Sequence, residues 1–267
     1  MRQPTSPAAA PGDPWTPTSE LAPYRVLARE RRTPTIVELL LAPLAEPLAY
    51  LPGQYVLLED RDGEVPPRSY SIANAPRDDG RIALLVTRVA DGPTSGWVHE
   101  RLAVGDEVRV SGPYGAFVSA AAATRPALYL AAGSGLAPIR ALLEAELARP
   151  RRPALTLLFS ARSEADVIDG ERFAAWQRDE PRFRFLRTLT RGAGPPPRGR
   201  LPGLLAELAG RLDGAEVFIA GAPGFVAACA DAAERLGAPR AEVHTEVFYA
   251  EPQPWSGAAP QASEPRR

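Results

Sequence analysis

The sequence predicts two domains, an antiparallel β-barrel followed by an α/β domain built on a parallel sheet. Its 267 residues exceed the length of most single domains. Short strand-like runs separated by Pro, Gly and Asp clusters make up the first half, and apolar runs alternating with helical stretches make up the second. We expect the barrel at 21–120 and the α/β domain at 126–249. The segments 1–20 and 250–267 are rich in Pro, Ala and Ser, so we expect both to be flexible.

Six strand-like runs make up the predicted barrel, and one short helix interrupts them. The runs are 24–30, 35–41, 54–60, 68–74, 81–89 and 106–112. The helix is expected over 95–103, with Ser95 as its N-cap. Regularly spaced short strands without long helical patterns are typical of a small antiparallel barrel.

The fourth run contains the stretch RSYS at 68–71. Because side chains alternate along a strand, Arg68 and Tyr70 would share one face. Ser69 and Ser71 would share the other. The pattern fits an ordinary half-buried strand, and it also fits one wall of a site for a flat, anionic ligand. Arg68 is accordingly either a partner for phosphate or a solvated surface arginine.

The second half alternates buried-strand runs with helical stretches. The strand runs are 127–132, 154–160, 183–189 and 215–221, with 244–250 as the last, and the helical stretches are 139–148, 171–179, 201–212 and 223–237. This alternation predicts a parallel sheet covered by helices on both faces.

A glycine-rich turn follows the first apolar run of the second half. The strand is expected to end at Ala132, the chain turns through Gly133, Ser134 and Gly135, and a helix follows with Pro138 at its first position. Glycines let the backbone approach a pyrophosphate, and a helix N-terminus supplies free amides and partial positive charge. Such a turn also occurs without any ligand, so alone it leaves both interpretations open.

Two further turns repeat this arrangement. They comprise Gly92, Thr94 and Ser95 before the barrel helix, and Gly221, Ala222 and Pro223 before the last long helix. The first is equally an ordinary capped helix. The second would lie beside the Gly133–Gly135 turn if their strands are neighbours, because turns at the carboxyl ends of parallel strands gather at one crevice.

Charge and composition narrow the possible partners. The net charge of −1 gives no electrostatic footprint for nucleic acid or an anionic membrane. No run approaches the ~20 apolar residues of a membrane span, and the first residues lack the apolar core of a signal peptide. We therefore expect a cytoplasmic protein that contacts neither nucleic acid nor membrane. The oligomeric state stays open.

The few cysteines and histidines argue against a metal centre. Cys229 is the single cysteine, which excludes an internal disulfide and a built-in iron–sulfur cluster, since a cluster needs about four thiolates. His99 and His244 are the two histidines, so we expect no zinc site.

The order of the motifs resembles the ferredoxin–NADP reductase superfamily, the two-domain FAD-dependent NAD(P)H oxidoreductases. The resemblance covers about residues 23 to 249. The matching stretches are PGQYV at 52–56, RSYS at 68–71, the Gly92–Ser95 loop, GPYG at 112–115, AAGSGLAP at 131–138, AGAP at 220–223 and EVF at 246–248. Each stretch alone is a weak signal, but their common order is specific.

The resemblance implies an FAD site in the barrel. Its residues would be Arg68, Ser69, Tyr70, Ser71, Gly92, Thr94 and Ser95. Arg68 and the Gly92–Ser95 loop would bind the pyrophosphate. Tyr70 would pack against the isoalloxazine, and Ser71 would hydrogen-bond flavin N5.

The resemblance also implies NADPH or NADH as the electron donor. Its site would comprise Gly133, Ser134, Gly135, Pro138, Arg162, Arg191, Gly221, Ala222 and Pro223. Arg162 and Arg191 would contact the adenosine ribose or its 2′-phosphate, and Thr190 before Arg191 favours NADPH slightly.

Ser71 and Glu246 are the expected catalytic residues. Glu246 matches a family glutamate near the flavin, which would position the nicotinamide or relay a proton; an ordinary strand carboxylate fits nearly as well. Phe248 or Tyr249 would cover the flavin face or simply pack.

Two positions depart from the family pattern. Ala220 stands where the family usually has a cysteine beside the hydride path, and Ala132 stands where it usually has a glycine. The missing thiol would slow hydride transfer without abolishing it.

Three functions are compatible with the resemblance. The first, which we favour, is a reductase that passes electrons from NAD(P)H through FAD to a separate acceptor protein, such as an iron–sulfur protein or a haem or non-haem oxygenase component. The second is an NAD(P)H:flavin reductase that releases reduced flavin. The third is a non-catalytic flavin-binding assembly subunit, which the two departures keep open.

Overall fold

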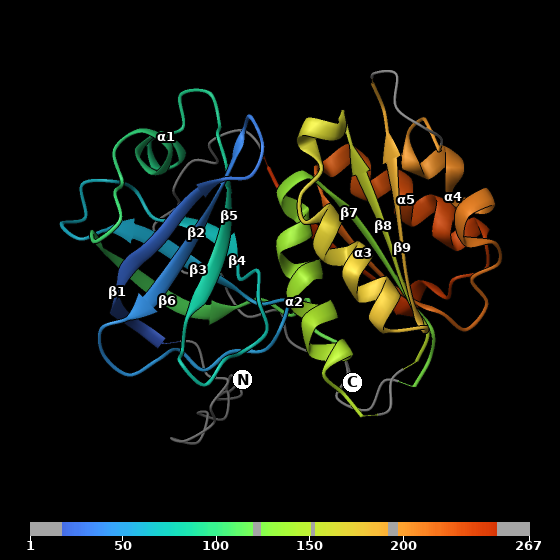
Figure 1. The fold of residues 1–267 in the computed structure, drawn as a ribbon, viewed down its shortest axis with the longest axis horizontal. Coiled ribbons are helices and arrows are strands. Elements are labelled where there is room, and N and C mark those ends of the chain that lie inside the picture. Colours follow the sequence, from blue (N-terminus) through green and yellow to red (C-terminus); the bar gives the residue numbers. More distant parts are fainter. Residues whose placement is uncertain (1–17, 120–123, 151–152, 192–196, 250–267) are drawn as a thin grey trace, which may run out of the picture.

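The computed structural model contains two domains packed side by side (Figure 1). It describes residues 18–119, 124–150, 153–191 and 197–249. The segments 1–17 and 250–267, expected to be flexible, lie outside the described residues. Residues 18–20, which we expected in the flexible lead-in, are instead the start of the first strand, because Thr18 pairs with Gly112.

The first domain is a six-stranded antiparallel sheet in the order β4-β3-β6-β1-β2-β5. Its strands are β1 (Thr18–Arg31), β2 (Ile36–Pro43), β3 (Tyr55–Asp60), β4 (Arg68–Ser71), β5 (Ile82–Thr87) and β6 (Glu107–Tyr114). A bridge between Ile72 and Leu84 links the two edges, so the sheet nearly closes. Apolar side chains such as Val56 and Leu84 fill its interior. The predicted antiparallel barrel is confirmed.

The barrel helix α1 (Pro93–Glu100) begins earlier than expected. Its N-cap is Gly92, and Pro93 occupies the first helical position, where a missing amide costs nothing. The prediction of Ser95 as N-cap is wrong. Ser95 lies inside the first turn, and its Oγ accepts a hydrogen bond from the Val89 amide at 3.1 Å, which ties the preceding loop to the helix.

The second domain is a five-stranded parallel sheet in the order β11-β10-β7-β8-β9. Its strands are β7 (Ala127–Ala132), β8 (Leu155–Ala161), β9 (Phe183–Leu189), β10 (Glu216–Gly221) and β11 (Val243–Val247). The direction of winding reverses between β7 and β10, which is where ligands bind in doubly wound sheets. The predicted parallel sheet is confirmed.

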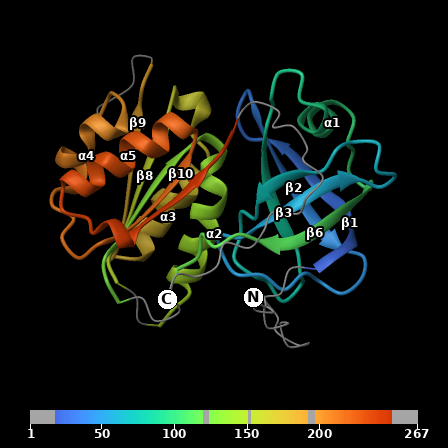
Figure 2. The same ribbon diagram turned by 180° about the vertical axis from the view of Figure 1, so that it is seen from behind.

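Four helices cover this sheet. They are α2 (Leu136–Leu147), α3 (Gly170–Asp179), α4 (Leu201–Ala209) and α5 (Pro223–Arg235). Helices α2 and α3 pack on one face, and α4 and α5 pack on the other (Figure 2). None of the helices in the described ranges is long and apolar enough to cross a membrane.

The glycine-rich turn differs from its expected form in one respect. Gly133–Gly135 form a short 3-10 turn and α2 starts at Leu136, so Pro138 is the third residue of the helix and not the first. Proline is tolerated there because the first-turn amides of a helix have no intrahelical acceptor. A Cβ on Gly135 would lie 2.3 Å from the Ala220 carbonyl oxygen, so only glycine lets the two turns approach this closely.

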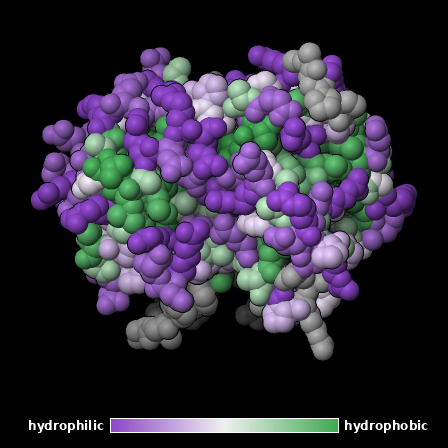
Figure 3. Space-filling view, in the orientation of Figure 1, coloured by the Kyte–Doolittle hydropathy of each residue, from purple (hydrophilic) through white to green (hydrophobic). Residues whose placement is uncertain are grey.

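Helix α2 lies between its own sheet and the barrel in both views (Figures 1 and 2). A single buried cluster joins Ala73 and Leu85 of the barrel to Tyr129 and Phe218 of the second domain. The two domains therefore share a core along this contact. The middle of the face seen in Figure 3, where α2 meets the barrel, is mainly hydrophilic at its surface.

Candidate functional site

A cavity of about 1020 Å³ opens between the two domains. Strand β4 and the N-terminus of α1 form its barrel side, and the Gly133–Gly135 turn, the end of β10 and strand β11 form the other. The predicted site residues that line it are Arg68, Ser69, Tyr70, Ser71, Gly92, Thr94, Ser95, Gly133, Ser134, Gly135, Gly221, Ala222 and Glu246. The RSYS strand and the glycine turn, 62 residues or more apart in sequence, thus face one cleft.

Four predicted site residues do not line this cavity. Pro138 is buried in the first turn of α2, and Pro223 is the first residue of α5. Arg162 and Arg191 follow the carboxyl ends of β8 and β9, and the Arg191 amide donates to the Arg162 carbonyl at 2.7 Å. The structure therefore brings the two arginines to one edge of the sheet, beyond the cavity wall.

A carboxylate accompanies these arginines. Arg162 Nη2 lies 2.5 Å from Asp166 Oδ1, and Ser163 Oγ donates to Asp166 Oδ2 at 2.8 Å. Burial acts to raise the pKa of Asp166, but the hydrogen bonds from Arg162 and Ser163 outweigh it and hold that pKa below its usual value. The guanidinium expected to meet a 2′-phosphate is thus already paired with an anion.

The register of β4 against β3 arranges the barrel wall. Tyr55 pairs with Ser71, and Val56 pairs with Tyr70. Tyr70 is partly buried against the barrel core, and burial raises the pKa of its phenol, which therefore stays neutral. This wall offers an aromatic surface next to a guanidinium and a hydroxyl, which suits a flat ring that carries a diphosphate.

The loop before α1 is held in shape by its own hydroxyls. Thr94 Oγ1 donates to the Pro66 carbonyl at 2.6 Å, which joins α1 to the chain just before β4. A Cβ on Gly92 would lie 2.8 Å from Ser95 Oγ, so a larger residue would disturb the turn. The free first-turn amides of α1 therefore adjoin Arg68 in the cavity wall, an arrangement that fits the pyrophosphate of FAD.

One hydrogen bond crosses the cleft beside this wall. Ser71 Oγ donates to Glu246 Oε1, so β4 of the barrel contacts β11 of the second domain. Burial raises the pKa of Glu246 to about 7, and the hydrogen bond from Ser71 acts in the opposite direction. Near neutral pH, Glu246 can therefore hold or release a proton at the cavity wall.

Comparison with known proteins assigns each of the two domains to a family. Residues 33–118 match the oxidoreductase FAD-binding domain family, and residues 129–231 match the oxidoreductase NAD-binding domain family. Over 208 residues the chain is 38% identical to ferredoxin–NADP reductase B of Sorangium cellulosum, which covers 73% of this chain and 84% of that protein. The chain belongs to the ferredoxin–NADP reductase superfamily. This reductase is an FAD-dependent NAD(P)H oxidoreductase, as its motifs predict.

Two further relatives are also reductases. The reductase is 33% identical over 210 residues to the reductase component of the naphthalene 1,2-dioxygenase/salicylate 5-hydroxylase systems of Ralstonia sp., covering 77% of this chain and 62% of that one. The crystal structure of the Amycolatopsis cytochrome P450 reductase GcoB superposes with a TM-score of 0.81 at 31% identity, covering 87% of this chain and 71% of that one.

The cavity of the reductase also contains residues that the sequence did not single out. They include Tyr55, Thr87, Phe117 and His244. Thr87 Oγ1 donates to Ser134 Oγ at 2.8 Å across the cleft. Tyr55 belongs to the PGQYV stretch, which was a signal, whereas Thr87 ends an ordinary apolar strand and gave none.

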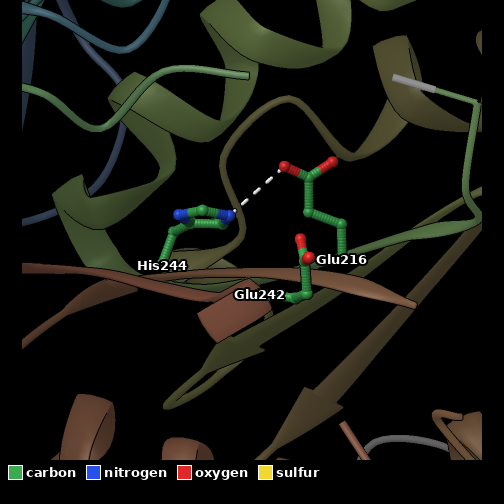
Figure 4. Close-up of side chains that lie close together, drawn as sticks. All are labelled: Glu216, Glu242 and His244. Carbon is green, nitrogen blue, oxygen red and sulfur yellow. Dashed lines mark ion pairs between the residues drawn. The ribbon is translucent and has the colours of Figure 1, made fainter. Parts of the chain in front are cut away.

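Glu216, Glu242 and His244 form a cluster that adjoins the cavity, which His244 also lines (Figure 4). Ligand atoms of Glu216, Glu242 and His244 all lie within 4.8 Å of one another. His244 Nε2 is 3.2 Å from Glu216 Oε1, and Arg125 Nη1 is 2.5 Å from Glu242 Oε1. Because cationic or protonatable partners already meet both carboxylates, we assign no metal here, and the absence of a metal centre stays a prediction.

Proposed function

We propose that this reductase passes electrons from NAD(P)H through FAD to a separate one-electron acceptor protein, such as an iron–sulfur protein or a haem or non-haem oxygenase component. The observation that carries the proposal is the shared cavity, where the RSYS strand and the glycine turn face each other. When bound, FAD supplies the chemistry by accepting a hydride from the nicotinamide and releasing electrons singly.

The chain's own residues would hold the two ligands in this cavity. Arg68 and the first amides of α1 would bind the FAD diphosphate, and Tyr70 would support the ring. The Gly133–Gly135 turn at the start of α2 would receive the dinucleotide diphosphate. The close approach of Gly135 to Ala220 supports this assignment, because it leaves the backbone of the turn as the cavity surface.

Ser71 and Glu246 would manage the proton at the reacting end of the cavity. Ser71 Oγ is hydrogen-bonded to Glu246, whose pKa of about 7 suits a group that exchanges a proton near neutral pH. In this role Ser71 orients the proton and Glu246 stores it. The second domain supplies Glu246, so the pair is complete only when the two domains are together.

The surroundings of Arg162 and Arg191 bear on whether the reductase uses NADPH or NADH. The pairing of Arg162 with Asp166 opposes binding of a 2′-phosphate, because a carboxylate repels it and occupies the guanidinium. We therefore propose that Arg191 alone supports NADPH and that Asp166 keeps NADH usable.

A protein acceptor in trans is supported by the cysteine content. Cys229, the single cysteine, belongs to α5 and is fully buried in the core, so the chain provides no thiolates for a cluster at the cavity. The relatives named as oxygenase and cytochrome P450 reductases support the same class of acceptor. The alternative is release of reduced free flavin.

Anaerobic spectroscopy followed by steady-state kinetics tests the proposal. NADH or NADPH should bleach the visible flavin absorbance of the purified protein. Turnover with a ferredoxin-type acceptor or an oxygenase component should then exceed turnover with added FMN. Turnover confined to free FMN would establish the flavin reductase instead, and a bound flavin that neither nucleotide reduces would refute both.

A further inference from the structure

The largest fully buried side chain of the described residues is an arginine with no place in the motifs above. Arg140 is 1% exposed and lies in α2, one turn beyond its first residues. Burial acts to lower the pKa of Arg140, but the carboxylates of Glu38 and Asp169 outweigh it, so the guanidinium stays charged. A buried charge with this many partners fixes the geometry of whatever it joins.

Arg140 joins three separate segments. Its Nε donates to the Ala73 carbonyl at 2.5 Å, its Nη1 to Asp169 Oδ2 at 2.6 Å, and its Nη2 to Glu38 Oε1 at 2.5 Å. Glu38 belongs to β2 of the barrel, and Asp169 is the N-cap of α3. The planar guanidinium therefore satisfies acceptors from both domains at once.

The Ala73 carbonyl, which accepts the hydrogen bond from Arg140 Nε, lies next to strand β4, where we propose that the flavin binds. Ala73 follows Ser71 by two residues, and its amide donates to the Ala83 carbonyl at 2.8 Å, within the contact that nearly closes the barrel. The Asn74 side chain holds the same segment by accepting from the Ala83 amide at 2.6 Å. Arg140 thus bonds to a segment of the barrel that hydrogen bonds to Ala83 already hold in place.

A second contact repeats this grip one turn along α2. Glu144 Oε2 accepts a hydrogen bond from the Ala75 amide at 3.0 Å. Arg140 and Glu144 lie on the same face of the helix, since residues four apart are neighbours on its surface. Helix α2, which starts at the glycine turn, is therefore anchored twice to the chain that continues from RSYS.

The ion pairs around Arg140 connect the two domains. Arg32 of the barrel lies 2.6 Å from Asp169 and 3.1 Å from Glu38, so both carboxylates pair with Arg32 of the barrel and with Arg140 of the second domain. Asp169 is 2% exposed, which makes any displacement of a partner costly. We name the set Arg32, Glu38, Arg140, Glu144 and Asp169 the seam.

We infer that Arg140 is a positioning residue that sets the separation between the flavin strand and the dinucleotide turn. The domains then act as one rigid unit, and the nicotinamide reaches the flavin without a domain rotation. The inference rests on the proposed placement of the two ligands. A misplacement of about 1 Å between reacting groups can cost up to roughly 100-fold in rate, so a device that fixes this distance has a kinetic role.

Arg140→Lys separates positioning from charge compensation. Lysine keeps the positive charge for Glu38 and Asp169 but cannot reproduce three divergent donors, so the hydrogen bond to Ala73 is lost. We expect near-normal flavin content and thermal midpoint, and a limiting rate of flavin reduction by NAD(P)H at least tenfold lower in stopped flow. Glu144→Ala removes only the second anchor and should slow reduction several-fold.

Arg172→Met is the matched control. Arg172 lies 3.5 Å from Asp169 and 3.7 Å from Glu144, within α3, but it does not reach the barrel segment. Its reduction rate should stay at the wild-type value. Hydrogen exchange of the flavin-free proteins gives a readout independent of activity: amides in 72–77 should exchange roughly tenfold faster in Arg140→Lys and at the wild-type rate in the control.

Wild-type reduction rates and wild-type exchange in both Arg140→Lys and Glu144→Ala would overturn the inference. If lysine does not support folding, the Glu144→Ala result decides. A wild-type protein that neither nucleotide reduces would refute the proposed function, while the exchange measurement would still test the grip of α2 on the barrel.

Discussion

Besides their shared apolar core, the two domains meet in two regions of opposite chemistry, the cavity and the seam. Across the cavity, each contact uses a short hydroxyl side chain: Thr87 bonds to the Ser134 hydroxyl, and Ser71 bonds to the Glu246 carboxyl group. Across the seam, long charged side chains form ion pairs between the domains, and those of Arg140 and Asp169 are almost fully buried. Ligands can replace the contacts at the cavity, whereas the ion pairs of the seam must stay in place.

This difference has an energetic basis. A neutral hydrogen bond contributes about 0.5–1.5 kcal/mol net, because water or a ligand replaces the lost partner. Removal of one partner from a buried ion pair costs about 3–5 kcal/mol, because the other charge is left uncompensated. The reductase therefore has its strongest contacts between the domains at the seam, farther along α2 than the glycine turn, and its weaker contacts at the cavity.

Breaking the seam should have the largest effect on stability. Asp169→Asn keeps a residue that tolerates the left-handed backbone of this position, φ 55°, but removes the charge that Arg140 and Arg32 share. We expect a loss of about 3 kcal/mol in the free energy of unfolding, measured by urea denaturation. The control is Glu164→Gln, whose pair with Arg187 is solvent-exposed, and it should change stability by less than about 0.5 kcal/mol. Equal effects would remove the distinction between buried and exposed pairs.

On the cavity side, the largest effect is expected from Arg68. Arg68→Ala should weaken FAD binding by about 1–3 kcal/mol, because a guanidinium that bonds a diphosphate is lost. Titration of the apoprotein with FAD measures this, and unfolding in the absence of FAD should be nearly unchanged. Arg61→Ala, on an exposed residue before β4, provides the comparison and should bind FAD normally. Unchanged FAD affinity in Arg68→Ala would reject its assignment.

The sequence predicted the elements well because their signals are local. Alternating or continuous apolar runs located the described strands of both sheets to within three residues, except that β1 begins six residues before its predicted run. The neighbouring placement of β7 and β10 follows the expected parallel arrangement. The errors at Ser95 and Pro138 came from helix starts, where a preceding Pro93 or a 3-10 turn shifts the first residue. Such shifts depend on backbone geometry that residue types alone do not fix.

The contacts between the domains could not be predicted from local sequence patterns. Ser71 and Glu246 are 175 residues apart, and Arg140 and Glu38 are 102 apart, so only the assembled fold brings them together. The motifs identified most of the cavity wall because each of them is a continuous stretch of the sequence. Arg140 had one signal, a lone arginine inside the apolar start of α2, but the sequence did not indicate its partners.

Glu246 at the cavity differs from the carboxylates of the seam. It is buried and hydrogen-bonded to Ser71, whereas Glu38 and Asp169 pair with arginines. Between pH about 4.5 and about 7 the folded chain keeps a proton on Glu246 that the unfolded chain releases. The free energy of unfolding should therefore fall as the pH rises through this range. Glu246→Gln should flatten that fall by on the order of 1–2 kcal/mol, measured by urea denaturation of the FAD-free protein at pH 5 and pH 8. An unaltered slope would show that Glu246 titrates as an ordinary surface carboxylate.

The choice between NADPH and NADH tests the ion pair of Arg162 with Asp166. The Arg162 side chain is exposed, so this pair is free to rearrange when a nucleotide binds. Asp166→Asn frees Arg162 and should lower the KM for NADPH by a few-fold, roughly 1 kcal/mol, with little change for NADH. Arg191→Ala should raise the KM for NADPH and leave that for NADH nearly constant. Parallel changes for both nucleotides in either variant would place the 2′-phosphate elsewhere.

The smallest effect is expected where the family thiol is missing. Ala220 is fully buried, in the same cluster as Phe117 and Phe218, and its side chain is not part of the cavity wall among the described residues. A sulfur atom added there must fit into packed surroundings, so Ala220→Cys should cost about 1 kcal/mol of stability and change the limiting rate of flavin reduction by less than about twofold. Ala131→Cys, its buried partner on β7, should behave alike. A several-fold faster reduction in Ala220→Cys alone, measured by stopped flow, would mean that the sulfur reaches the nicotinamide and that the native alanine limits hydride transfer.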